Sequence, residues 1–170
     1  MIRIALTGPE SSGKTTLAHQ LGDHLNAPVF LEYARTYLEN LEREYIQEDL
    51  DRMCEGHLEQ FEQEVKSKSD FLIVDTDFIV LKIWSKVRFG SVSKIILDAV
   101  DSSYFDLHIL CSPDIPWEYD PQREHPDQRD ELFQLYRQEL TLSQKNFIEV
   151  SGSEEERLKK SLAAIASIQS

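Results

Sequence analysis

The segment at residues 8–15 has the residue types and spacing of a phosphate-binding loop. Its sequence, Gly-Pro-Glu-Ser-Ser-Gly-Lys-Thr, matches the pattern G-x-x-x-x-G-K-[ST] in full. Gly8 and Gly13 permit backbone angles that turn successive N–H groups inward, where they can surround phosphate oxygens. Lys14 can then reach the β- and γ-phosphates. The pattern predicts a nucleotide site built from Gly8, Glu10, Ser11, Ser12, Gly13, Lys14, Thr15 and Thr16.

A phosphate loop of this kind needs a magnesium ion and a carboxylate on a neighbouring strand. Asp75 closes the apolar run at residues 71–74, and Asp77 offers a second carboxylate two residues later. We expect Mg²⁺ to be held by the Thr15 hydroxyl together with Asp75 and Asp77. Asp77 also has a structural explanation, because it is well placed to cap the helix that follows.

Glu32 and Arg35 are candidates for the acceptor side of a phosphoryl transfer. Glu32 ends the second predicted strand, and ligands of open α/β sheets bind at that edge. Its carboxylate could accept a proton from a hydroxyl nucleophile, or it could hold ribose hydroxyls while Asp75 or Asp77 takes the proton. Arg35 could neutralise phosphate charge. A surface ion pair between Glu32 and Arg35 would explain the same spacing without a ligand.

Residues 113–130 are rich in proline and carry Arg123 and Arg129. Phosphoryl-transfer enzymes use mobile loops to cover the phosphates and exclude water, so this segment is a predicted lid. Its arginines could instead pair with acidic neighbours on a solvated face. Ser151 and Gly152 follow the last predicted strand and are expected near the nucleotide base, although a glycine before a capped helix needs no ligand to explain it.

Short apolar runs alternate with amphipathic helical segments along the chain, which predicts a three-layer α/β fold with a parallel sheet. Strands are expected at residues 2–6, 28–32, 71–74, 107–111 and 147–150. Helices are expected at residues 14–26, 47–66, from about 80 to 90, 93–101, 127–143 and from 153 onward. No linker, repeat or low-complexity tract divides residues 1–170, so we expect a single domain.

The composition narrows the classes of partner. The 170 residues carry 31 acidic and 18 basic side chains, for a net charge of −13 and a pI near 4.7. Nucleic-acid binding needs clustered Lys and Arg and is not expected. Two cysteines cannot form a disulfide framework and are typical of a reducing compartment. Without a signal peptide or an apolar run of roughly 20 residues, we expect a cytoplasmic protein with no membrane partner. The sequence leaves the oligomeric state open.

With these motifs in hand, the chain resembles the ribosylnicotinamide kinase domain of the bacterial bifunctional NAD-biosynthesis regulator family, within the wider group of P-loop ATPase/kinase domains. The resemblance covers nearly the whole chain. It rests on residues 8–16, on Glu-Tyr-Ala-Arg and the residues after it at 32–38, on Asp-Thr-Asp at 75–77, and on Pro-Asp-Ile-Pro-Trp at 113–117, which leads into Arg123 and Glu124.

The resemblance implies a nucleoside-monophosphate-kinase-like fold, a lid, ATP and Mg²⁺. It implies ATP-dependent phosphorylation of a small nucleoside acceptor, with nicotinamide riboside giving the 5′-monophosphate, and it turns Glu32 and Arg35 toward that acceptor. The chain shows no DNA-binding segment or adenylyltransferase domain, so control of transcription is not expected. A regulatory ATPase or nucleotide switch is the alternative, and no motif distinguishes ATP from GTP. The residues expected to act in catalysis are Lys14, Glu32, Arg35, Asp75, Arg123 and Arg129.

Overall fold

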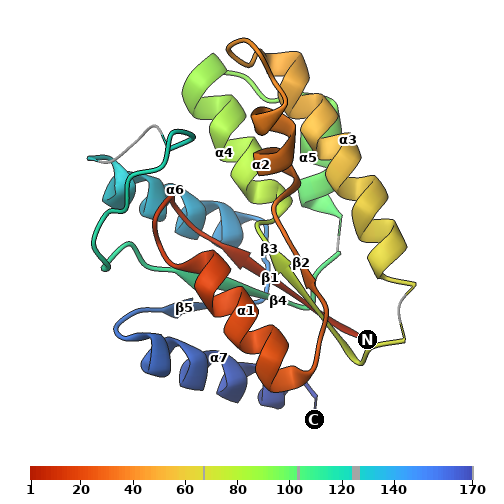
Figure 1. The fold of residues 1–170 in the computed structure, drawn as a ribbon, viewed down its shortest axis with the longest axis vertical. Helices are drawn as coiled ribbons and strands as arrows, with labels where there is room; N and C mark the ends of the chain where they lie inside the picture. Colours follow the sequence, from red (N-terminus) through yellow and green to blue (C-terminus); the bar gives the residue numbers. More distant parts are fainter. Residues whose placement is uncertain (67, 103, 124–126, 170) are drawn as a thin grey trace.

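A parallel sheet forms the centre of the computed structural model, which describes residues 1–66, 68–102, 104–123 and 127–169. Its strand order is β2-β3-β1-β4-β5 (Figure 1). The strands are β1 (Ile2–Thr7), β2 (Val29–Phe30), β3 (Phe71–Asp75), β4 (Leu107–Cys111) and β5 (Phe147–Val150). β4 is buried along its whole length, as the continuous apolar runs predict for a sheet covered on both faces. The predicted α/β fold is confirmed.

Helices cover both faces of this sheet (Figure 1). One face carries α1 (Lys14–Leu25) and α7 (Glu154–Ile168), whose leucines and isoleucines pack on β1 and β4. The other face carries α2 (Tyr33–Glu39), α3 (Gln47–Glu64), α4 (Phe78–Phe89), α5 (Lys94–Asp101) and α6 (Arg129–Leu142). None of the helices in the described part of the chain is long and apolar enough to cross a membrane.

The segment after α1 differs from the prediction. The sequence predicts a strand at residues 28–32, whereas β2 comprises only Val29–Phe30, because it is an edge strand that pairs with β3 alone. Residues 33–39 then form α2, which the sequence analysis does not predict. Ala34 is buried and Tyr33, Tyr37 and Leu38 pack partly buried against the same core, so the apolar period of α2 spans only seven residues and rests largely on tyrosines. The other four strands agree with the prediction to within one residue.

The register of the sheet brings the carboxyl ends of its strands to one edge. Leu6 of β1 lies beside Asp75 of β3, Thr7 lies beside Leu110 of β4, and Cys111 lies beside Val150 of β5. The loops that leave these strands, at residues 8–13, 76–77, 112–118 and 151–153, therefore meet at that edge. This is the edge where ligands of open α/β sheets bind.

A buried carboxylate fixes the connection between α2 and α3. Asp49, in the first turn of α3, has no exposed surface. It accepts hydrogen bonds from both terminal nitrogens of Arg43 (2.6 and 2.9 Å), from the Tyr37 hydroxyl (2.8 Å) and from the Ile46 N–H (2.8 Å). The Arg43 hydrogen bonds hold the pKa of Asp49 well below its usual 3.8.

We predict that Asp49→Asn lowers the free energy of unfolding at pH 7 by about 2–4 kcal/mol, because the donors from Arg43, Tyr37 and Ile46 lose an ionised acceptor that is buried. The native pKa of Asp49 lies below the unfolded value of 3.8, so the parent loses this stabilisation as the pH falls below 3.8, and the variant does not. Urea unfolding at pH 7 and pH 3 measures both effects. Asp98→Asn is the control, since Asp98 is an exposed partner of Lys94. Matching curves for Asp49→Asn and the parent would contradict the prediction.

Candidate functional site

Residues 8–13 turn the chain sharply between the end of β1 and the start of α1. Gly8 (φ +135°), Ser11 (φ +51°) and Gly13 (φ +80°) all have left-handed backbone angles. A Cβ atom on Gly8 would lie 2.7 Å from the Cys111 carbonyl oxygen, so only glycine fits there. No side chain caps the N-terminus of α1, which leaves the first N–H groups of that helix for an anion. The local geometry is that of a phosphate nest.

Lys14 and Thr15 open α1 directly after this turn. The Lys14 Nζ folds back over the loop and donates to the carbonyl oxygens of Gly8 (3.0 Å) and Pro9 (2.8 Å). The Thr15 hydroxyl donates to Oδ2 of Asp75 at 2.6 Å, which joins the phosphate loop to the end of β3. A flexible ammonium at this position can move from the carbonyls to a bound phosphate.

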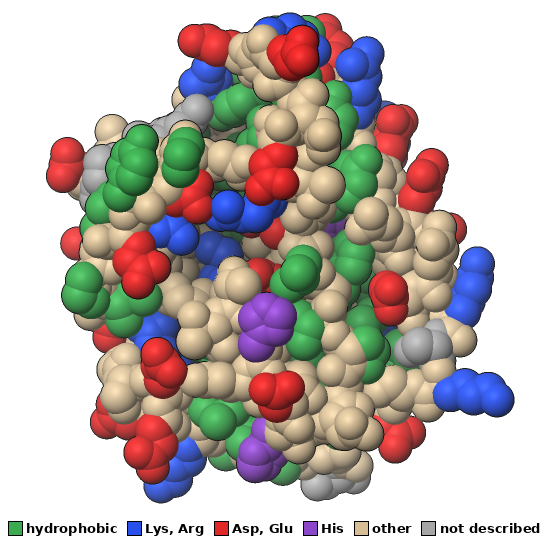
Figure 2. Space-filling view, viewed as in Figure 1, with side chains coloured by type: hydrophobic (Ala, Val, Ile, Leu, Met, Phe, Trp, Pro, Cys, Tyr) green, Lys and Arg blue, Asp and Glu red, His purple; other side chains and the backbone are tan. Residues whose placement is uncertain are grey.

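A cavity of about 650 Å³ lies over the loop, and its volume is within the range of small-molecule sites. The predicted residues that line it are Gly8, Glu10, Ser11, Ser12, Gly13, Lys14, Thr15, Thr16, Glu32, Arg35, Arg123 and Gly152. Asp75, Asp77, Arg129 and Ser151 are predicted residues that lie outside this lining. Figure 2 shows a hollow on this face, with Lys and Arg side chains at its floor. The cavity thus joins the phosphate loop to the predicted acceptor residues.

The surroundings of Asp75 suit a magnesium ion. Its carboxylate is buried, Oδ2 accepts the Thr15 hydroxyl, and Oδ1 accepts no hydrogen bond from any described residue. Spare carboxylate lone pairs beside a hydroxyl are the oxygen ligands that Mg²⁺ prefers. Among the described residues, no group of three or more His, Cys, Asp or Glu could hold a metal by itself. A magnesium ion here would therefore also need phosphate and water ligands, which is the usual arrangement for this ion.

The Asp77 carboxylate accepts hydrogen bonds from neighbouring residues. Its Oδ1 accepts hydrogen bonds from the Ile79 N–H (3.1 Å), which caps α4, and from the Thr7 hydroxyl (2.9 Å). Its Oδ2 lies 3.5 Å from Nε2 of His108. Burial raises the pKa of Asp77 to about 7. The capping role of Asp77 is thus present, and a metal role for it stays a prediction.

Glu32 and Arg35 line the same cavity, and the ion-pair partner of Arg35 is Asp120. Glu32 lies at the N-terminus of α2, where burial raises the pKa of its carboxyl group and the nearby Lys14 ammonium opposes the rise. Arg35 forms an ion pair with Asp120 at 2.8 Å, which ties α2 to the loop after β4. A carboxylate with a raised pKa facing a phosphate loop is suited to proton acceptance.

The two arginines of the predicted lid have different positions. Arg123 lines the cavity, whereas Arg129 begins α6 and donates through Nη1 to the carbonyl oxygens of Ser11 and Ile115, each at 3.0 Å. Their Cζ atoms lie 5.9 and 5.7 Å from the centre of the Trp117 ring. The Arg129 side chain therefore contacts the backbone of the phosphate loop.

The loops after β4 and β5 carry the predicted lid and the residues expected near the nucleotide base. Residues 124–126, which include Glu124 of the quoted motif and the middle of the lid, lie outside the described residues. Gly152 has φ +85°, lines the cavity and donates its N–H to Oδ2 of Asp114 at 2.7 Å. The loop after β5 is thus tied to the loop after β4, beside the cavity.

Sequence reasoning missed Arg157, Trp84 and Tyr136, all of which line the cavity. Arg157 is 3% exposed. It lies on α7 in register with the buried residues Ser161 and Ile165, four and eight residues later. An arginine on the buried face of an amphipathic helix is the signal that could have identified it.

Solved structures with the same fold define its class. A deoxyadenosine kinase from M. mycoides, with products bound, has a TM-score of 0.70 at 15% identity, and the match covers 98% of this chain and all of the other. A NadR protein in complex with NR gives 0.78 at 24% identity, covering 98% of this chain and 51% of that one. A NadR protein in complex with NAD and AMP-PNP gives 0.81 at 22% identity, covering 98% and 49%. The protein has the P-loop fold of nucleoside and nucleotide kinases.

The family follows from the sequence. The chain belongs to the AAA_28 (AAA domain) family, whose model matches residues 3–157. It is 30% identical over 126 residues to the trifunctional NAD biosynthesis/regulator protein NadR of Escherichia coli, and equally so to that of Salmonella typhimurium. Each match covers 71% of this chain and 30% of the relative, so the chain spans less than a third of the length of these relatives. The resemblance found in the motifs is confirmed.

We predict that Lys14→Ala abolishes the rise in melting temperature that Mg-ATP causes in the parent, because the loop loses the one mobile cation that can follow the phosphates. Differential scanning fluorimetry over a range of Mg-ATP concentrations measures the rise. Lys94→Ala serves as the control, since Lys94 is an exposed partner of Asp98. A Lys14→Ala protein that Mg-ATP stabilises as strongly as the parent would show that the loop does not bind the phosphates.

Proposed function

We propose that the protein is an ATP-dependent kinase of a small nucleoside, with nicotinamide riboside as the favoured acceptor. The observation that carries the proposal is the single cavity shared by the phosphate loop and Glu32. A donor phosphate and an acceptor hydroxyl can meet there without either leaving the protein. We also propose that residues 1–170 act as one kinase domain and that it works in the cytoplasm, where its two buried free cysteines would stay reduced.

On the donor side, the N–H groups of residues 8–13 and the Lys14 ammonium would hold the β- and γ-phosphates. Thr15 and Asp75 would hold Mg²⁺, which supplies neutralisation of the phosphate charge when bound. Arg123 lines the same cavity and would add positive charge where the transferred group becomes most anionic. Arg35 would also add positive charge there, once it leaves Asp120 and pairs with a phosphate.

On the acceptor side, Glu32 would orient the 5′-hydroxyl and take its proton late in the transfer. The transition state of phosphoryl transfer is loose, so a base mainly positions the nucleophile. The raised pKa of Glu32 makes it a better proton acceptor than an ordinary glutamate. If Glu32 instead holds ribose hydroxyls, its loss would weaken acceptor binding more than turnover.

Aromatic and acidic residues that line the cavity favour an acceptor with a cationic ring. Trp84 of α4 and Tyr136 of α6 bring aromatic side chains to the cavity, which also carries the carboxylates of Glu10 and Glu32. Aromatic faces and carboxylates attract a delocalised cation. The pyridinium ring of nicotinamide riboside is such a cation, and ordinary nucleosides have neutral bases. The NadR protein crystallised with NR supports the same acceptor.

We predict that ATP turnover rises sharply with nicotinamide riboside and forms ADP and a nucleoside monophosphate in equal amounts. Uridine and the uncharged dihydro form of nicotinamide riboside should support slower turnover, because they lack the cationic ring. A coupled ADP assay with phosphorus NMR of the products measures both. ATP hydrolysis that is unaffected by any nucleoside would identify a regulatory ATPase and contradict the kinase assignment.

We predict that Glu32→Gln lowers kcat by about 10²–10⁴-fold at saturating acceptor and leaves ATP affinity nearly unchanged. Because burial raises the pKa of Glu32 above 4.5, parent turnover should fall with decreasing pH before an ordinary glutamate would titrate, and the variant should lack this acid limb. Steady-state kinetics from pH 5 to 9 measure both effects. Glu39→Gln, at the exposed end of α2, is the control. A higher acceptor KM with normal kcat would assign Glu32 to the ribose, and unchanged kinetics would remove it from the site.

A further inference from the structure

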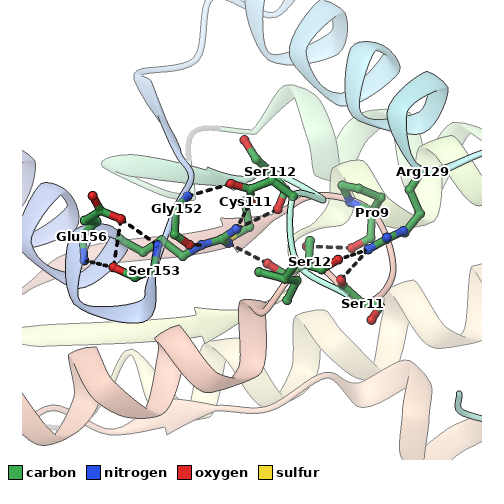
Figure 3. A network of polar contacts seen from close by, with 12 residues as sticks. Pro9, Ser11, Ser12, Cys111, Ser112, Arg129, Gly152, Ser153 and Glu156 are labelled. Atoms are coloured by element: carbon green, nitrogen blue, oxygen red, sulfur yellow. Dashed lines mark hydrogen bonds and ion pairs between the residues drawn. The ribbon is translucent and has the colours of Figure 1, made fainter. Parts of the chain in front are cut away.

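Two consecutive carbonyl groups of the phosphate loop are each held by an arginine. The Ser11 carbonyl accepts a hydrogen bond from Nη1 of Arg129 at 3.0 Å, and the Ser12 carbonyl accepts one from Nη1 of Arg157 at 2.8 Å. Figure 3 shows Arg129 reaching Ser11 from one side, with Ser112 and Gly152 beside Ser12 on the other. Two helices that are far apart in the sequence, α6 and α7, thus supply cations to one turn of backbone.

Arg157 is bound by an almost complete set of acceptors. Its Nε donates to the Gly152 carbonyl (2.9 Å) and its Nη2 to the Ser112 carbonyl (3.0 Å). Nη2 also forms an ion pair with the carboxylate of Asp114. Burying a guanidinium is costly unless its charge and its N–H groups find partners. This arginine therefore has one fixed position, against the phosphate loop and the loops that follow β4 and β5.

The geometry of a peptide bond transmits these contacts to the cavity. A trans peptide is planar, so its carbonyl oxygen and its N–H point in opposite directions. The carbonyls of Ser11 and Ser12 point toward the arginines, and the N–H groups of the same two peptide units belong to Ser12 and Gly13, which line the cavity. A cation on the oxygen of an amide polarises the amide and strengthens its N–H as a donor.

We propose that Arg129 and Arg157 are positioning residues for nucleotide phosphate, acting through the peptide units 11–12 and 12–13 without touching the phosphate themselves. Their charges would act on the phosphate through the N–H groups of Ser12 and Gly13, two residues that line the cavity. The ligand class is a polyphosphate anion, and the inference rests on the proposed nucleotide site. In this proposal Arg129 holds the phosphate loop in place, which differs from the lid role predicted from the sequence.

Calorimetric titration of inorganic tripolyphosphate and of Mg-ATP tests the proposal on the whole chain. Arg157→Lys keeps a charge but cannot bind all these acceptors together, and Arg129→Met removes the cation on the neighbouring peptide. Each variant should weaken binding of both ligands by about tenfold, comparable to the loss of one good hydrogen bond. The KM for ATP should rise by the same factor while the acceptor KM stays unchanged, a split that a general loss of structure would not give.

Arg137→Met is the matched control, since Arg137 also lies on α6 and pairs with Glu149. It should bind tripolyphosphate like the parent. If Arg157→Lys fails to fold, Arg129→Met at its half-buried site carries the test. If Arg129→Met and folded Arg157→Lys bind both ligands as tightly as the parent does, the positioning role is wrong and the nucleotide site is unaffected. A parent that binds neither ligand would overturn the nucleotide site as well, and a parent that binds both but has no acceptor-dependent turnover would overturn only the kinase proposal.

Discussion

The backbone of residues 8–13 must turn its N–H groups toward one point, and the rest of the site depends on that constraint. The left-handed angles at Gly8, Ser11 and Gly13 produce the turn. The carbonyl groups of the same turn need donors of their own. Lys14 supplies donors to two of them, and Arg129 and Arg157 supply donors to two others. The parallel sheet makes this possible by bringing the loops of β1, β4 and β5 to one edge.

Cations line this site in an otherwise acidic protein. The chain has a net charge of −13, yet Lys14, Arg35, Arg123 and Arg157 all line one cavity. Carboxylates are also present, since Glu10, Glu32, Glu118 and Glu154 line the same cavity, and Asp120 and Asp114 pair with Arg35 and Arg157. Four cations on one concave surface allow anion binding there despite the net negative charge of the chain.

The fold and the phosphate loop could be predicted because their sequence signals are local. Gly8 is required by the close approach of Cys111, and apolar runs mark strands buried on both faces. α2 was not predicted because its apolar period is short: seven residues, with Ala34 buried and Tyr33, Tyr37 and Leu38 partly buried. The position of Arg157 on the buried face of α7 is a signal in the sequence, but the groups that it binds are not. The partners of Arg157 are backbone carbonyls in three separate loops, and because every residue has a backbone carbonyl, the sequence does not show which ones accept hydrogen bonds.

Amide resonances report most directly on whether the N–H groups of the phosphate loop bind the nucleotide. A ¹⁵N-labelled parent would be titrated with a nonhydrolysable ATP analogue and Mg²⁺ and followed by heteronuclear correlation spectra. We expect large downfield proton shifts at Ser12, Gly13 and Lys14, because these N–H groups gain charged acceptors. Unchanged resonances for these three residues at saturating analogue would contradict it.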